Sequence, residues 1–153
     1  MKKLILKEEQ LKIILENETI QQYLSLIKTA NVDDIKFEAE EIDNDFYNVQ
    51  IYINNIAIPS GLISFSISSY DNGYKVEGIN VAPSLRGNNV TQKIYHSFIK
   101  NVGDLYSVYD NRSKSDDAKA VPRIWNKLKQ QSDIKTKQKI DKNNNPIADY
   151  GYI

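Results

Sequence analysis

The sequence predicts an α+β (α/β) protein, built as three α/β/α layers around a mixed central sheet of about six to seven strands. Apolar residues keep a helical period before residue 30 and a period of two from residue 35 to 81. Helix, strand and helix patterns then alternate. The length of 153 residues fits one domain with a buried core. We therefore expect a single domain over residues 1–153, with helices in 1–30 and the sheet and crossover helices in 34–153.

Two helices are expected at the N-terminus. Apolar residues at helical spacing predict one helix from Glu8 to Asn17 and another from about Thr19 to Thr29. These helices would either dock on the domain or recruit a protein partner.

Alternating apolar residues then predict four strands, antiparallel at first, that are separated by turn residues. The segments Asn54–Asn55 and Pro59–Gly61 consist of residues typical of turns. The pair Asn72–Gly73 strongly favours a two-residue hairpin turn. The predicted strands cover residues 35–39, 46–53, 63–67 and 74–81.

The second half alternates between helices and strands. A turn-rich loop at 82–89 leads into a helix from Val90 to Lys100, followed by a strand from Leu105 to Tyr109. A helix over 116–130 and a hairpin over 134–153 complete the chain. Strands 74–81 and 105–109 flank a helix, which predicts a parallel central pair joined by a right-handed crossover.

Composition excludes several function classes. The chain has no cysteine, so disulfides, thiolate metal sites and a cysteine nucleophile are excluded. No apolar run approaches the ~18 residues of a membrane span. The apolar run near Met1 is too short for the core of a signal peptide. We expect a soluble, cytoplasmic protein that binds neither membrane nor nucleic acid, because no dense run of Lys and Arg exists.

The zero net charge hides an asymmetry. Residues 1–60 carry six basic and eleven acidic side chains (−5), whereas residues 61–100 balance at +2 and residues 101–153 at +3. Ordinary surface variation explains this. The alternative is a mildly basic side that attracts an anion such as a phosphate.

The loop over residues 82–91 is the most informative segment. It follows a strand and opens a helix, so its backbone N–H groups have no helical acceptors, and the helix dipole favours an anion there. Gly87 and Asn88–Asn89 tolerate the positive φ of an anion-binding nest, and Arg86 would add a charge. The pattern predicts a phosphate site.

Here the sequence resembles the GNAT (GCN5-related N-acetyltransferase) superfamily, specifically over residues 76–98. Val81-Ala82-Pro83 followed by Arg86-Gly87-Asn88-Asn89-Val90-Thr91 is similar to the strand end and pyrophosphate loop of that family. The resemblance implies the GNAT-like fold and acetyl-CoA (coenzyme A) as cofactor. It implies a cofactor site made of Val81, Arg86, Gly87, Asn88, Asn89, Val90 and Thr91. A small-molecule or peptide amine would be the acceptor.

The same resemblance implies catalytic groups on the strand before the loop. A backbone N–H near Ile79 to Val81 would hold the oxyanion, and Glu77 would be the base that removes a proton from the amine. The alternative for Glu77 is a solvated strand residue. Many members of the family use a tyrosine hydroxyl as general acid, and this sequence has Trp125 at that position. If a general acid exists here, Tyr109 or Tyr106, at the end of the next strand, would take its place.

Departures from the family pattern keep a second hypothesis open. Trp125 stands where the family usually has a tyrosine, no Gly-Phe follows, and Thr91 is bulkier than the usual glycine or alanine. The run Ser-Asp…Ile-Trp-x-x-Leu around Trp125 resembles a branch of GNAT-like proteins encoded by tailed bacteriophages. The alternative is therefore a non-catalytic phage structural or host-interaction protein, in the bacterial cytoplasm or on the virion. Its partner would bind residues 1–30 or the tyrosines near the C-terminus.

Other polar residues give no separate site. His96 is expected to be a lone exposed histidine, since no second ligand stands at metal-binding spacing. The pairs Asp33–Asp34 and Asp116–Asp117 are expected to be cap or turn residues. No metal is predicted.

Overall fold

The computed structural model describes residues 8–109 and 116–153, with side chains over 18–109 and 121–153. The helices are α1 (Glu8–Thr29), η1 (Val32–Asp34), η2 (Pro83–Leu85), α2 (Val90–Asn101) and α3 (Asp116–Leu128). The strands are β1 (Ile35–Asp43), β2 (Phe46–Ile53), β3 (Ile56–Ala57), β4 (Ile63–Tyr70), β5 (Gly73–Val81), β6 (Leu105–Val108), β7 (Lys135–Ile140) and β8 (Pro146–Tyr152). The predicted α+β class is confirmed.

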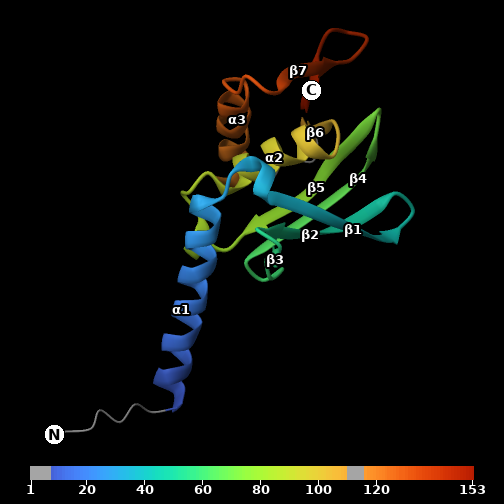
Figure 1. Ribbon diagram of the computed structural model, residues 1–153. Coiled ribbons are helices and arrows are strands. Elements are labelled where there is room, and N and C mark those ends of the chain that lie inside the picture. Colours follow the sequence, from blue (N-terminus) through green and yellow to red (C-terminus); the bar gives the residue numbers. More distant parts are fainter. Residues whose placement is uncertain (1–7, 110–115) are drawn as a thin grey trace, which may run out of the picture.

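One mixed sheet of eight strands forms the centre of the molecule (Figure 1). Its order is β1-β2-β4-β5-β6-β8-β7, and β3 pairs with β2. The predicted parallel central pair is β5 and β6, and the other pairs are antiparallel. The extra strand relative to the expected six or seven is β3. It forms because Asn54 (φ 50°) and Asn55 (φ 66°) make a tight turn that folds two residues back onto β2.

Burial alternates along the strands, which separates the two faces of the sheet. On β4, Ile63, Phe65 and Ile67 are buried, while the serines between them are more exposed. Helix α2 packs on the buried face, where its Phe98 lies 5.9 Å from the ring of Phe65. The core therefore lies between this face and α2.

Helices α1 and α3 flank α2. The Lys93 Nζ of α2 donates to the Ile27 carbonyl near the end of α1 at 2.8 Å. Trp125 of α3 lies 6.1 Å from the ring of Tyr95 on α2. Among the described residues, the opposite face carries exposed polar side chains in place of the second helical layer that the three-layer expectation requires. The turn at Asn44–Asp45, where Asp45 has φ 59°, joins β1 directly to β2 and leaves no helix between them.

Two local predictions are corrected. The N-terminal segment is one continuous helix. Asn17 and Thr19 each lower helix stability by less than ~1 kcal/mol, and no Gly or Pro interrupts the segment. The β4–β5 hairpin turns at Asp71–Asn72, since Tyr70 pairs with Gly73. Gly73 serves packing instead, because a Cβ there would lie 2.3 Å from the Asp104 carbonyl oxygen.

Within the described part of the chain, no helix is both long and apolar enough to cross a bilayer.

Candidate functional site

The parallel strands β5 and β6 separate shortly after they begin. Tyr74 pairs with Leu105 and Lys75 with Tyr106, and no pair follows, although β5 continues to Val81. A bulge at Glu77 accompanies the separation, because Val76 pairs with Ile67 and Gly78 with Ser66. Bulges bend a strand and increase its twist. Beyond Lys75, the edge of β5 that faces β6 therefore has no paired strand among the described residues.

The loop between β5 and α2 has the backbone of an anion nest. Gly87 has φ 84° and Asn89, the N-cap of α2, has φ 56° without a side-chain cap bond. Asn88 has no positive φ. Its Nδ2 donates to the carbonyls of Leu85 and Arg86 at 3.0 and 3.2 Å, and these bonds within the loop stabilise its conformation.

The backbone amides of residues 87–92 are free of protein acceptors within the described residues. The loop amides of Leu85 and Arg86 donate to Ala82 and Pro83, and the first bonded amide of the helix is that of Lys93, which donates to Asn89. Unbonded amides at a helix N-terminus carry the positive end of the helix dipole. The loop therefore favours an anion.

A cavity of about 420 Å³ lies between this loop, the end of β5 and helix α3. Among the described residues, three cationic side chains line it, Arg86 from the loop and Arg123 and Lys127 from α3, and no carboxylate does. The Arg86 Nε donates to the Val81 carbonyl at 2.9 Å, and the Lys127 Nζ donates to the Asn89 Oδ1 at 2.5 Å. Strand end, loop and α3 are thus joined around a positively charged cavity.

The structure brings six of the seven predicted cofactor residues to this cavity: Val81, Arg86, Gly87, Asn89, Val90 and Thr91. Asn88 is the exception. Sequence analysis missed the contribution of α3. Two basic residues four positions apart lie on the same helix face, and Arg123 and Lys127 have this spacing.

The two predicted catalytic residues lie in different places. Glu77 sits at the bulge, where its Oε1 accepts a hydrogen bond from the Ser68 Oγ at 2.6 Å and lies 3.3 Å from the Lys75 Nζ. The Tyr109 hydroxyl donates to the Asp149 Oδ1 at 3.1 Å and accepts from the Gln138 Nε2 at 2.9 Å. Neither residue lines the cavity.

Trp125 is a core residue. Its side chain is 2% exposed and does not line the cavity. In the part of the chain that the structure describes, the buried indole Nε1 has no hydrogen-bond partner. The same is true of the buried Oε1 of Gln92, a residue that does line the cavity. Gln92 thus adds an unsatisfied polar atom to the cavity residues.

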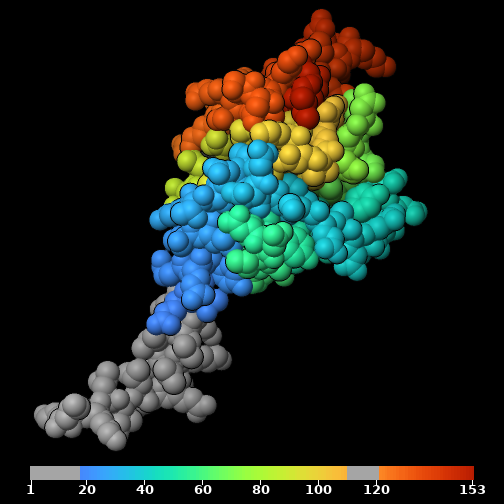
Figure 2. Space-filling view, in the orientation of Figure 1, coloured from blue at the N-terminus to red at the C-terminus, as the bar shows by residue number. Residues whose placement is uncertain are grey.

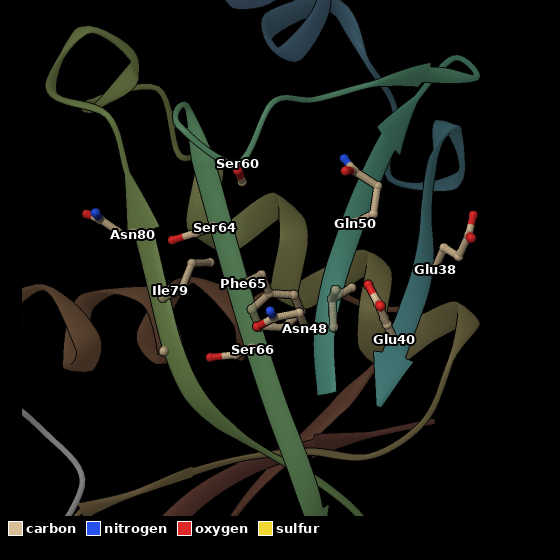
Figure 3. A pocket seen from close by; sticks show the side chains of 12 residues that line it. Glu38, Glu40, Asn48, Gln50, Ser60, Ser64, Phe65, Ser66, Ile79 and Asn80 are labelled. Atoms are coloured by element: carbon tan, nitrogen blue, oxygen red, sulfur yellow. The ribbon is translucent and has the colours of Figure 1, made fainter. Parts of the chain in front are cut away.

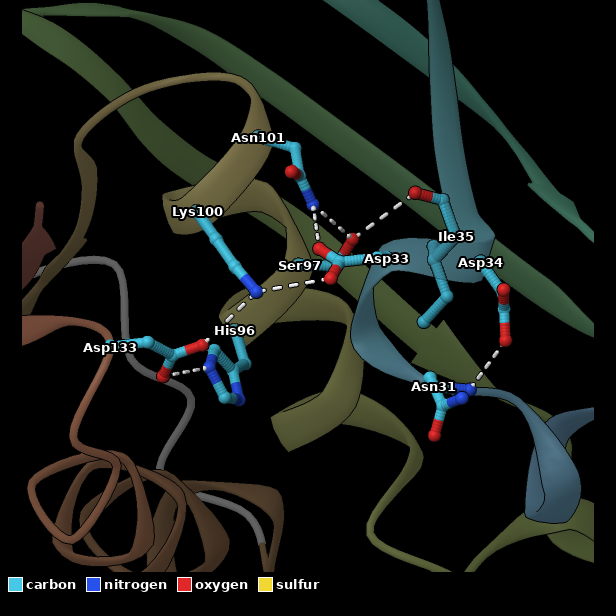
Figure 4. Close-up of polar contacts among 9 residues, drawn as sticks. All are labelled: Asn31, Asp33, Asp34, Ile35, His96, Ser97, Lys100, Asn101 and Asp133. Atoms are coloured by element: carbon cyan, nitrogen blue, oxygen red, sulfur yellow. Dashed lines mark hydrogen bonds and ion pairs between the residues drawn. The ribbon is translucent and has the colours of Figure 1, made fainter.

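The expectation of a lone, exposed His96 is wrong. His96 is buried, and its Nε2 lies 2.7 Å from the Asp133 Oδ1 (Figure 4). Lys100 Nζ lies 3.4 Å from Asp133 and 3.1 Å from Asp33. Burial opposes ionisation of Asp133, but hydrogen bonds from His96 and Lys100 outweigh it and lower the pKa of this carboxyl. The partner lies 37 residues along the chain, on the segment between α3 and β7.

This polar cluster is structural. It joins η1, α2 and the segment before β7, and no group of three or more metal-ligating side chains occurs in the described residues. The cap expectation for Asp34 is confirmed, since its Oδ2 accepts from the Asn31 amide at 2.8 Å. The side chains of Asp116 and Asp117 lie outside the described set.

A second cavity, of about 470 Å³, opens on the helix-free face of the sheet (Figure 3). Its lining comes from β1, β2, β4 and β5, together with Ser60. Ile79 and Asn80 of β5 line both cavities. The end of β5 is therefore the wall between them.

The likeness of the chain to known proteins is distant and structural. No family model and no curated protein matches the chain. A solved structure from Bacteroides thetaiotaomicron, named as a putative acetyltransferase from the GNAT family, is 13% identical. The match covers 92% of this chain and 81% of that one, with a TM-score of 0.42. At this level neither a family nor an activity is shown for the chain.

Proposed function

We propose that the protein is an acyl-CoA-dependent N-acyltransferase that moves an acetyl group from acetyl-CoA to an amine. The observation that carries this proposal is the positively charged cavity beside the split between β5 and β6. A diphosphate ester needs N–H donors and cations at one end, and its attached chain needs room to lie along the protein. The residues present fit both requirements.

The amides of residues 87–92 would hold the diphosphate, and Arg86 would add its guanidinium. Arg123 and Lys127 would neutralise further phosphate charge from the side of α3. When bound, acetyl-CoA supplies a thioester whose acetyl carbon forms a C–N bond with the amine as its C–S bond breaks and the thiol leaves. The free edge of β5 after Lys75 offers backbone groups along which such a chain can bind.

Glu77 is the residue that would accept the amine proton, directly or through water. It stands at the bulge, where β5 turns away from β6, and its side chain is 24% exposed. The Ser68 hydroxyl and the Lys75 ammonium fix the orientation of its carboxylate. A backbone amide near Ile79 to Val81 would stabilise the oxyanion that develops on the acetyl group.

The second candidate is a protein that keeps this fold without catalysis. The positions of Trp125 in the core and of Tyr109 in its bond to Asp149 favour it, since neither supplies an acid to the cavity. The two functions differ in turnover: a non-catalytic protein forms no acetylated amine, whether or not it binds the cofactor.

Thermal unfolding with and without acetyl-CoA tests the cofactor site. At ~100 times the dissociation constant, the ligand should stabilise the protein by about 2.7 kcal/mol. For a chain of this length, the midpoint should then rise by roughly 5–10 °C. Arg86→Ala and Lys127→Ala should each reduce the rise. Lys129→Ala, which removes a cation directly after α3 but not from the cavity lining, should leave it unchanged. No rise at millimolar acetyl-CoA refutes the proposal.

Turnover with a panel of amines tests the base. Glu77→Gln keeps the shape and the Ser68 contact but cannot accept a proton, so we expect the rate to fall by about 10²-fold or more with the acetyl-CoA shift intact. Equal rates for Glu77→Gln and the unaltered protein would remove Glu77 from the mechanism.

A further inference from the structure

Two rows of residues, polar except for Gly78, cross the helix-free face of the sheet and line the second cavity. Both rows start on β1 and end on β5, perpendicular to the strands (Figure 3). The first row is Glu40, Asn48, Ser66 and Gly78, each paired with the next across the sheet. The second starts with the pair Glu38 and Gln50 and ends with the pair Ser64 and Asn80.

The charge of this groove is entirely negative. Glu38 and Glu40 are carboxylates, and no lysine or arginine among the described residues lines the cavity. The Glu40 carboxylate has no hydrogen bond or ion pair in the described part of the chain, and the Glu38 carboxylate accepts one hydrogen bond, from the Tyr52 hydroxyl at 3.2 Å. The hydrogen bond and charge of Glu38 raise the pKa of Tyr52, as a local negative potential requires.

The other end of the groove reaches the candidate active site. Ile79 and Asn80 line both cavities, and Gly78 leaves that end open because it has no side chain. A Cβ at Gly78 would lie 3.3 Å from the Ser66 Oγ. Three steps between neighbouring strands separate β1 from β5, a distance of roughly 14 Å. The groove thus joins two carboxylates to the wall of the cofactor cavity.

We propose that this groove binds the acceptor amine and that the acceptor is a linear polyamine. One ammonium group lies at Glu38 and Glu40, and the reacting nitrogen lies at the β5 end, beside Gly78. The side-chain amides and serine hydroxyls between them accept hydrogen bonds from the intervening nitrogens. This assignment rests on the proposed function for its chemistry, while the binding itself needs no cofactor.

Isothermal titration of the cofactor-free protein tests the binding. Spermine, which is extended and cationic along its length, should bind at least about tenfold more tightly than putrescine, which is too short to span the groove. Decylamine, which has the length but one charge, should also bind more weakly. Affinity for spermine should fall as salt rises. Equal affinity for spermine and putrescine would overturn the proposal.

The carboxylates supply the matched variants. Glu38→Gln combined with Glu40→Gln should weaken spermine binding about tenfold or more, and both side chains are exposed, so folding is not at risk. Glu41→Gln makes the same kind of change on the same strand. Because side chains alternate between the two faces of a sheet, residue 41 belongs to the other face, and it lies outside the cavity lining. Equal weakening by Glu41→Gln would refute a specific site at Glu38 and Glu40.

Failure of this proposal and failure of the enzyme proposal give different results. An acetyl-CoA stabilisation without any spermine binding leaves the enzyme and overturns the polyamine groove. Spermine binding that depends on Glu38 and Glu40, without acetyl-CoA stabilisation, supports the groove and overturns the enzyme. Faster acetylation of a lysine peptide than of spermine, unaffected by the two Glu→Gln changes, would overturn the groove as the acceptor site.

Discussion

Two residues set the direction of the amides in the loop between β5 and α2. Gly87 at φ 84° and Asn89 at φ 56° both lie in the left-handed region, which bends the chain so that consecutive N–H groups converge. Glycine enters this region without a steric penalty, and asparagine enters it more readily than other residues with a Cβ. The backbone conformation, more than any side chain, makes this loop suited to a phosphate.

Gly87→Ala therefore tests backbone strain without a clash. No atom lies within 4 Å of the position of a Cβ at Gly87, so the expected loss of about 1–2 kcal/mol in the free energy of unfolding comes from φ alone. Urea denaturation measures it. Asn89→Gly should be tolerated at that φ with a smaller loss. A Gly87→Ala variant as stable as the unaltered protein would show that the loop relaxes out of the left-handed region.

Asp133 gives the molecule an acid-sensitive contact. Its pKa is lowered in the folded state, so it contributes stability above the unfolded pKa, near 4, that is lost as the pH falls through the folded value. Asp133→Asn should lower the unfolding midpoint at pH 7 and lose less stability than the unaltered protein between pH 5 and pH 3. Thermal unfolding across that range checks it. Parallel curves for the two proteins would show that Asp133 does not account for the acid sensitivity.

These residues show where sequence interpretation succeeds and fails. Gly87 and Asn89 were predictable, because their conformational preference is local. The pair of His96 and Asp133 was not, since two segments that are 37 residues apart meet only in the folded chain. The same holds for Lys127, which reaches Asn89 across 38 residues.

At the scale of elements, the sequence predicts the parallel pair of β5 and β6 but not their separation. Crossover connections impose the pairing. The separation depends on the bulge at Glu77, for which the neighbouring Gly78 was the available signal, because a glycine within a strand often accompanies a bulge. The single helix α1 was missed because Asn17 and Thr19 favour caps only when the chain has a reason to stop there.

Trp125 is a large side chain in the contact between helices α3 and α2. It is 2% exposed and lies 6.1 Å from the Tyr95 ring, yet its Nε1 donates to no acceptor among the described residues. Trp125→Ala should cost about 3–5 kcal/mol in the free energy of unfolding, because it leaves a large cavity. Trp125→Phe should cost far less, because removing a buried, unsatisfied N–H offsets part of the lost packing.

Urea denaturation and acetyl-CoA binding together check this prediction. If Trp125 only anchors α3, Trp125→Phe keeps the acetyl-CoA stabilisation. If Trp125→Phe folds stably but loses that stabilisation, the indole N–H is part of the cofactor site and the assignment of Trp125 to the core is wrong.

At the scale of the molecule, the balance of charge changes from negative in the first 60 residues to positive in the rest of the chain. Among the coloured residues of the space-filling view, residues 18–60 fill the lower and middle part and the C-terminal strands lie at the top (Figure 2). The loop before α2 and α3 itself belong to the segments with positive balance, whereas Glu38 and Glu40 belong to the negative one. A cationic acceptor and an anionic cofactor would thus be attracted to different parts of one protein.

The C-terminal tyrosines form a packed row on the helix-free face. Tyr106 of β6 stacks on Tyr150 of β8 at 4.6 Å and meets Tyr70 of β4 edge-on at 5.0 Å. The Lys139 Nζ lies 4.5 Å from the centre of the Tyr70 ring. This row ties the end of the sheet formed by β8 and β7 to its centre, at the end of β5 that is still paired with β6.

Alkaline unfolding should therefore report on Tyr106. Burial, with the nearby charge of Asp71, raises the pKa of Tyr106 to about 12. The neutral phenol is favoured in the folded state, so stability is unaffected below the unfolded pKa of 10 and falls as the pH rises towards 12. Two pH units correspond to roughly 2–3 kcal/mol. Tyr106→Phe should flatten this loss, as measured by urea denaturation at pH 9 and pH 11.5.

Absorbance titration of the phenolates separates the two causes. The folded protein should show an ionisation near pH 12 that Tyr106→Phe lacks. Asp71→Asn should move that ionisation to lower pH, because the Asp71 charge repels the phenolate and its Oδ2 accepts the Tyr106 hydrogen bond at 3.5 Å. Since burial is the larger cause, the ionisation should stay above pH 10 in Asp71→Asn. A return of the Tyr106 pKa to 10 in Asp71→Asn would mean that the Asp71 charge, rather than burial in this row, raises it.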